Sequence, residues 1–175
     1  MKFLPYERLK IITALRHEEV LKRLDDVIEP KRYFRLLQSG TKPYQGSRES
    51  SHFEVSRIIG YRNSFLPIIK GDVQSEISGC SVHITMHPYI PVIAFMIIWL
   101  GFVGFSLLFF LYLLVSSSTD LFVGFIPGGM FLFGYGLFLG GFKFESVKSK
   151  KFFRELFEAR EVEEMGIANP FETVG

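Results

Sequence analysis

The stretch that decides the fold is YIPVIAFMIIWLGFVGFSLLFFLYLLVSSSTDLFVGFIPGGMFLFGYGLFLGGF, from Tyr89 to Phe142. It contains no Lys, Arg, Glu or His, and its one charged residue, Asp120, follows a short polar run of serines and a threonine. Roughly 20 apolar residues in a helix span the ~30 Å hydrocarbon core of a bilayer. The sequence therefore predicts two transmembrane helices, at about 91–115 and 121–142, joined by a tight polar loop.

The hairpin divides the chain into three parts. We expect an N-terminal cytoplasmic α+β domain at 1–88, the transmembrane hairpin at 89–143, and a cytoplasmic amphipathic helix with a flexible tail at 144–175. The orientation follows from the basic residues beside the membrane, because a cluster of them comes just after the second helix and the connecting loop has none. Both termini are thus predicted to be cytoplasmic, and the basic residues concerned are Lys143, Lys148, Lys150, Lys151 and Arg154.

Alternation and turn spacing in the N-terminal part predict a small antiparallel sheet with one or two packing helices. Val82, Ile84 and Met86 alternate with polar residues and give the clearest strand, and helical spacing of apolar residues predicts an amphipathic helix at 17–28. Together with the hairpin these elements predict an α+β fold with a meander of strands. The predicted strands are 8–15, 32–37, 53–59, 66–74 and 81–87, and residues 46–51 are predicted to be a loop.

A second amphipathic helix is predicted at 146–162, where Phe153, Leu156 and Phe157 alternate with charged residues. Two positions suit it. It docks on the N-terminal sheet, or it lies flat on anionic lipid headgroups, because a basic amphipathic helix with aromatic residues has the chemistry for the membrane surface. The last residues, from Ile167 to Gly175, show no periodicity and are predicted to be a loose tail.

The second membrane helix carries two pairs of glycines four residues apart. Small residues at this spacing let two helix backbones approach closely. The motifs predict packing against the first helix of the hairpin or, through the remaining small face, a homo-oligomer. The residues are Gly124, Gly128, Gly136 and Gly140.

Composition and motifs argue against several classes of function. The formal net charge is only +2, without the dense basic surface that phosphate backbones need, so no nucleic-acid partner is expected. The single cysteine, Cys80, allows no intrachain disulfide, and His83 and His87 are ~13 Å apart on a strand, too far to share a metal. No catalytic residues, metal or cofactor are predicted. A candidate patch for an anion or a lipid headgroup combines Arg62, Lys70, Lys148 and Lys151.

Four segments together resemble a family of small bacterial, cyanobacterial-type membrane proteins with two transmembrane helices and no assigned activity. They are 61–71 (YRNSFLPIIKG), 81–86 (SVHITM), 97–100 (IIWL) and 141–145 (GFKFE). This resemblance implies a bacterial membrane, plasma or thylakoid. The order of strand, helix, strands and last helix also resembles helix-grip domains of the START or polyketide-cyclase type, with a membrane-inserted PH-like domain as the alternative.

Two functions fit these observations. The first is a non-enzymatic membrane protein whose cytoplasmic domain binds a protein partner, a lipid or a small apolar ligand at the membrane surface. The second is an accessory or assembly subunit of a larger membrane complex. Membrane lipids are expected partners in both. An apolar pocket between sheet and helix favours the first function, and a solid core with intramembrane grooves favours the second.

Overall fold

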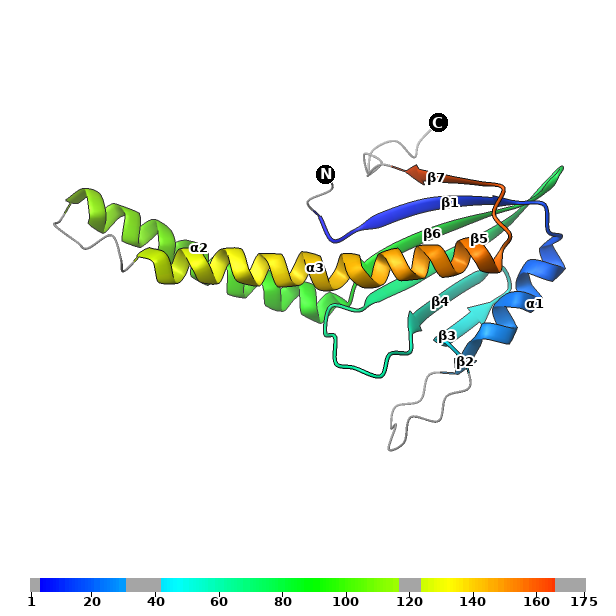
Figure 1. The fold of residues 1–175 in the computed structure, drawn as a ribbon, viewed down its shortest axis with the longest axis horizontal. Helices are drawn as coiled ribbons and strands as arrows, with labels where there is room; N and C mark the ends of the chain where they lie inside the picture. Colours follow the sequence, from blue (N-terminus) through cyan, green and yellow to red (C-terminus); the bar gives the residue numbers. More distant parts are fainter. Residues whose placement is uncertain (1–3, 31–41, 117–123, 166–175) are drawn as a thin grey trace.

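In the computed structural model, which describes residues 4–30, 42–116 and 124–165, a seven-stranded sheet carries one short helix and two long helices that pack as a hairpin (Figure 1). The strand order is β2-β3-β4-β5-β6-β1-β7. The fold is α+β, as the sequence predicts. The strands are β1 (Glu7–Thr13), β2 (Ile28–Pro30), β3 (Tyr44–Glu49), β4 (His52–Arg57), β5 (Pro67–Glu76), β6 (Gly79–Pro88) and β7 (Glu161–Met165), and the helices are α1 (His17–Val27), α2 (Ile90–Ser116) and α3 (Phe125–Leu156).

The centre of the sheet is the antiparallel meander β3 to β6, which continues into β1 and β7 through antiparallel pairs. Among the strands of the described ranges, β2 alone pairs in parallel, with β3. The longest pair is β5 with β6, with Pro67 opposite Pro88 and Glu76 opposite Gly79. Strand β6 ends at Pro88, so the chain leaves this end of the sheet for α2, which begins at Ile90.

The C-terminal part of α3 lies on one face of the sheet and supplies much of its core (Figure 1). Phe142, Phe153 and Phe157 are completely buried against strand residues such as Leu9 and Ile84. This position agrees with the docked alternative for the second amphipathic helix. The opposite face of the sheet carries mostly polar and charged side chains, because successive residues of a strand point to opposite faces.

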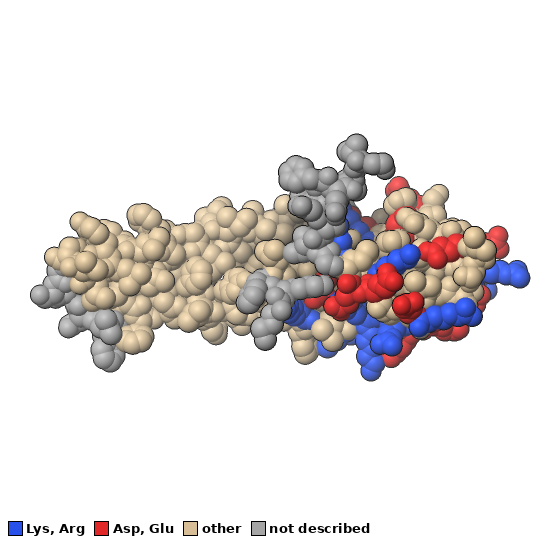
Figure 2. Space-filling model, turned by 90° about the horizontal axis from the view of Figure 1, so that it is seen from above, with Lys and Arg blue, Asp and Glu red and all other residues tan. Residues whose placement is uncertain are grey.

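Helices α2 and α3 form the apolar hairpin, and both are long and apolar enough to cross a membrane. In the most apolar window of each helix only 11% of the residues are buried, unlike the core helix of a water-soluble protein. On the face shown in Figure 2, the charged side chains gather on the sheet end of the molecule and the hairpin is free of them. Such a large exposed apolar surface indicates contact with lipid or with another protein.

One continuous helix joins the hairpin to the sheet. Its 32 residues correspond to about 48 Å of length. The sequence predicts a break between 142 and 146, where the charged residues begin, but the helix continues through them. The same rigid element is therefore exposed and apolar at one end and part of the core at the other.

Two predicted elements need correction. Residues 44–49 form strand β3 where a loop was predicted at 46–51, and residues 161–165 form strand β7 where the helix was predicted to reach residue 162. Both strands form through pairing with neighbours, β3 with β4 and β7 with β1, which outweighs their weak local propensity for strand. The predicted strand 32–37 and the predicted tail lie outside the described residues.

Gly134 makes a tight contact with α2 within the hairpin. A Cβ added there would lie 2.1 Å from Cζ3 of Trp99, which packs directly on the α3 backbone. We expect Gly134→Leu to lower the unfolding free energy of the hairpin by about 1–3 kcal/mol, because the indole must move away. Gly129→Leu is the matched control, since nothing lies within 4 Å of that position. Trp99 fluorescence during denaturation in detergent measures both variants, and equal stability would contradict the contact.

Candidate functional site

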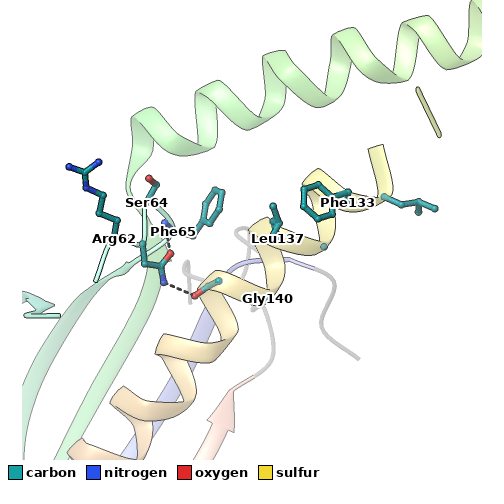
Figure 3. A pocket seen from close by; sticks show the side chains of 10 residues that line it. Arg62, Ser64, Phe65, Phe133, Leu137 and Gly140 are labelled. Atoms are coloured by element: carbon teal, nitrogen blue, oxygen red, sulfur yellow. Dashed lines mark hydrogen bonds between the residues drawn. The ribbon is translucent and has the colours of Figure 1, made fainter. Parts of the chain in front are cut away.

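A groove opens where the loop between β4 and β5 meets α3. We call it the junction groove, and its volume is about 700 Å³. In Figure 3 the ring of Phe65 points from the loop toward α3, while the side chain of Arg62 extends outward from the rim. One end of the groove is therefore polar and the other apolar. Its lining residues are Arg62, Asn63, Ser64, Phe65, Leu132, Phe133, Gly136, Leu137, Gly140 and Gly141.

The loop is fixed on α3 by Asn63 and Phe65. The side-chain amide of Asn63 donates a hydrogen bond to the carbonyl oxygen of Gly141 at 3.2 Å, and its Oδ1 accepts one from the Phe65 backbone at 3.0 Å. Phe65 also makes an edge-on contact with Phe138, with ring centroids 5.4 Å apart. A Cβ at Gly141 would lie only 2.9 Å from the Phe65 ring, so the loop can pack this closely on α3 only because residue 141 is glycine.

Beside the groove lies a set of polar side chains that we call the anchor cluster, formed by Arg57, Tyr61, Glu145 and Lys148. Glu145 is completely buried, and its Oε2 accepts a hydrogen bond from Nη1 of Arg57 at 2.9 Å. Its other oxygen accepts a hydrogen bond from the Tyr61 hydroxyl, and Lys148 lies 3.4 Å away. Because these residues come from β4, the following loop and α3, the cluster holds the loop at a fixed place on the helix.

Lys148 closes the outer side of the anchor cluster. Its Nζ lies 3.7 Å from the centre of the Phe144 ring and 3.3 Å from the Tyr61 hydroxyl. A cation over an aromatic face is stabilised by the ring quadrupole. Lys148 therefore has partners on three sides and contributes little free positive charge to the surface.

Tyr44, a buried core residue, stays neutral. Burial raises the pKa of its phenol to about 12, and the nearby Glu145 carboxylate acts in the same direction. A phenol with this pKa is protonated at neutral pH and is a poor general base.

The four residues of the predicted anion patch lie in different places. Arg62 is on the groove rim and Lys148 belongs to the anchor cluster. Lys70 pairs with Glu54 at 3.5 Å on the sheet face opposite α3, and Lys151 pairs with Glu155 at 4.0 Å along α3. Of the four, Arg62 alone lines the groove.

The predicted glycine contacts divide into two groups. Gly124 and Gly128 face α2, where an added Cβ would lie 2.0 Å from Phe110 and 3.9 Å from Leu107. Around Gly136 and Gly140 nothing lies within 4 Å among the described residues, and both line the junction groove. The close contacts at Gly134 and Gly141 carry no spacing motif that predicts them.

Glu145 is the site residue that sequence reasoning missed. Phe142, Glu145, Ser149 and Phe153 share one buried face at helical spacing, which becomes visible only if the helix continues beyond residue 142. Because the sequence analysis predicted a break between 142 and 146, it did not place Glu145 on the same helix face as Phe142.

The groove lining offers little reactive chemistry, because Arg62 is its only titratable side chain. Across the described ranges no three His, Cys, Asp or Glu side chains come close enough together to hold a metal ion. Cys80 lies in the core, and burial raises the pKa of its thiol. The arrangement is suited to binding a molecule that has both polar and apolar parts.

The chain was compared with protein-family models, with curated proteins and with solved structures, and no match was found in any of the three comparisons.

Proposed function

We propose that this chain is a non-enzymatic integral membrane protein whose α+β domain lies at the cytoplasmic surface and binds a lipid, a protein partner or a small apolar ligand there. The observation that carries the proposal is α3, which is apolar and mostly exposed before Phe142 and contributes to the sheet core from Phe142 onward. A domain built on the extension of a membrane helix keeps a fixed distance from the bilayer.

The junction groove supports binding at this surface. It begins beside Phe142, at the end of the apolar part of α3, and runs along Gly140 and Gly136 toward the hairpin. In the proposed orientation its polar end lies among the lipid headgroups and its apolar end beside the acyl chains. The likeness to helix-grip domains and to the bacterial two-helix family remains part of this proposal. The likeness to helix-grip domains is supported by the last helix, α3, which lies across one face of the sheet.

A photo-crosslinking amino acid at Ser64, on the groove rim, tests this function in native membranes. We expect an adduct of defined mass that does not form when the crosslinker replaces Ser78. That control position is exposed in the turn between β5 and β6, at the opposite end of the sheet. Equal labelling at the two positions would contradict a binding site at the junction.

A second function, a subunit of a larger membrane complex, is favoured by a different observation. A groove of about 370 Å³ lies between α2 and α3, and its lining is almost entirely apolar, including Phe102, Phe110 and Ile126. The space between α3 and the sheet is filled by phenylalanine side chains, which is the solid core expected for such a subunit. Another helix is a natural occupant of an apolar groove within a membrane.

Filling that groove tests the second function. Ser106 lines it and Leu108 does not, although both lie on α2. If the chain is a subunit, Ser106→Phe reduces the assembly purified in mild detergent to a single chain, and Leu108→Phe leaves it intact. Light scattering measures the mass of each. A wild-type protein that purifies as one chain of 20.1 kDa would contradict this function.

A further inference from the structure

We propose that the junction groove is a binding site for one phospholipid with an anionic headgroup, with the phosphate at Arg62 and an acyl chain along Gly136 and Gly140. This inference rests on the proposed function, because it requires the hairpin to cross a bilayer.

The shape of the groove fits an acyl chain. Gly136 and Gly140 leave the helix backbone bare, and nothing in the described chain lies within 4 Å of a Cβ added at either position. Leu132, Phe133 and Leu137 supply apolar walls along the same stretch of helix. A volume of about 700 Å³ lies within the range of pockets that bind small organic molecules.

The charge of the groove fits a phosphate. Arg62 is exposed at the polar end, and no ion pair to it is formed within the described part of the chain. None of the lining residues is acidic, and Ser64 adds a hydroxyl donor beside Arg62. Lys143 adds a second positive charge nearby, since it lies three residues after Gly140 on the same side of α3. Guanidinium groups bind phosphate oxygens through paired, charge-assisted hydrogen bonds.

The depth of the groove favours a lipid over a second helix. The apolar wall ends at Gly141, two residues before Lys143, the first charged residue of α3. The headgroup would therefore lie at the polar end of the groove and the acyl chain along its apolar end. A helix packed on Gly136 and Gly140 would also cover Arg62 and cost the hydration of its charge unless it carried an acidic residue. A lipid reaches the groove by lateral diffusion and keeps its headgroup in water.

Native mass spectrometry of the full chain released from nanodiscs tests the site. The nanodiscs contain equal amounts of phosphatidylglycerol and phosphatidylcholine, and the readout is the ratio of the two lipids retained. We expect the wild type to retain phosphatidylglycerol about tenfold more often, because both headgroups carry a phosphate but phosphatidylcholine also places the positive charge of its choline beside Arg62. Arg62→Gln should abolish this preference, and Gly140→Leu should remove both lipids.

Matched controls separate a site from general attraction. Arg154→Gln removes the same charge from an exposed position farther along α3, and Gly129→Leu adds the same side chain to an open position outside the groove. Both should behave as the wild type. Equal losses in Arg62→Gln and Arg154→Gln would overturn the proposal, as would displacement of the lipid by water-soluble glycerol phosphate.

Failure of the lipid site and failure of the proposed function give different results. If no lipid is retained while the crosslinker at Ser64 captures a protein or a second copy of the chain, the lipid site is wrong and the surface-binding function stands. If alkaline carbonate extracts the chain from membranes, the proposed function itself is wrong.

Discussion

Phe153→Ala is expected to lower the free energy of unfolding of the α+β domain by about 3–5 kcal/mol, the usual cost of removing a buried phenylalanine. Phe153 is completely buried, and its ring centroid lies 5.1 Å from that of Tyr44, 5.8 Å from Phe157 and 6.0 Å from Phe53. The substitution therefore leaves a cavity between α3 and two strands. Because domains of this size have about 5–15 kcal/mol of stability, the variant approaches global unfolding.

The lone cysteine measures this effect. Cys80 is 1% exposed, so a thiol reagent added along a urea gradient labels it only as the domain opens. Phe144→Ala is the matched control, because it removes the same side chain from the same helix at a position that is 58% exposed. We expect the control to cost about 1 kcal/mol or less, mainly through its contact with Lys148. Equal labelling midpoints for the two variants would show that α3 does not dock on the sheet.

Arg57→Met is expected to cost about 3–5 kcal/mol, because it leaves the buried carboxylate of Glu145 without its arginine. Glu145 is 0% exposed, and the remaining partners, Tyr61 and Lys148, compensate only part of its charge. The same Cys80 labelling along urea reports the loss. The junction loop should loosen as well, since Arg57 connects β4 to α3 through this carboxylate.

A double-mutant cycle separates the buried charge from simple loss of side-chain volume. Adding Glu145→Gln to Arg57→Met removes the uncompensated charge and should recover most of the stability. Lys70→Met is the matched control, since it breaks an exposed pair with Glu54 and should cost less than about 1 kcal/mol. If the double variant is no more stable than Arg57→Met alone, the stability lost in Arg57→Met does not come from the uncompensated charge of Glu145.

Elements with a strong local pattern could be predicted from the sequence. Strand β6 follows from the alternation of Val82, Ile84 and Met86, and the hairpin follows from the 54 residues from Tyr89 to Phe142, in which Asp120 is the only charged residue. Each of these patterns depends directly on which side chains are buried and which face water or lipid. Helix α1 was predicted to within one residue at its C-terminal end because its apolar face and the following proline are both local signals.

Elements that form only by pairing with another strand could not be predicted from the sequence. Strand β3 contains Gly46, where an added Cβ would lie 2.1 Å from the Glu54 carbonyl oxygen, so its glycine reflects close strand packing and not a turn. Strand β7 holds three glutamates and forms because β1 offers an open edge. Neither partner is visible in the local sequence.

The candidate site was predictable in part. The sequence predicted Arg62 as part of a patch for an anion or a lipid headgroup, and the structure places Arg62 on the groove rim. The sequence could not show that Lys70 lies across the sheet from α3, because that depends on strand alternation within the folded sheet. Nor could glycine spacing show which glycines contact a helix, since Gly134 packs on Trp99 and Gly136 on nothing in the described chain.

The central claim is that α2 and α3 cross a membrane and that α3 carries the domain on its cytoplasmic side. Single cysteines in a Cys80→Ser background test it, with Ser117→Cys between the two helices and Ser47→Cys on β3. We predict that an impermeant thiol reagent labels Ser117→Cys in intact cells and labels Ser47→Cys only after permeabilisation. Labelling of both positions, or of Ser47→Cys alone, in intact cells would contradict the account.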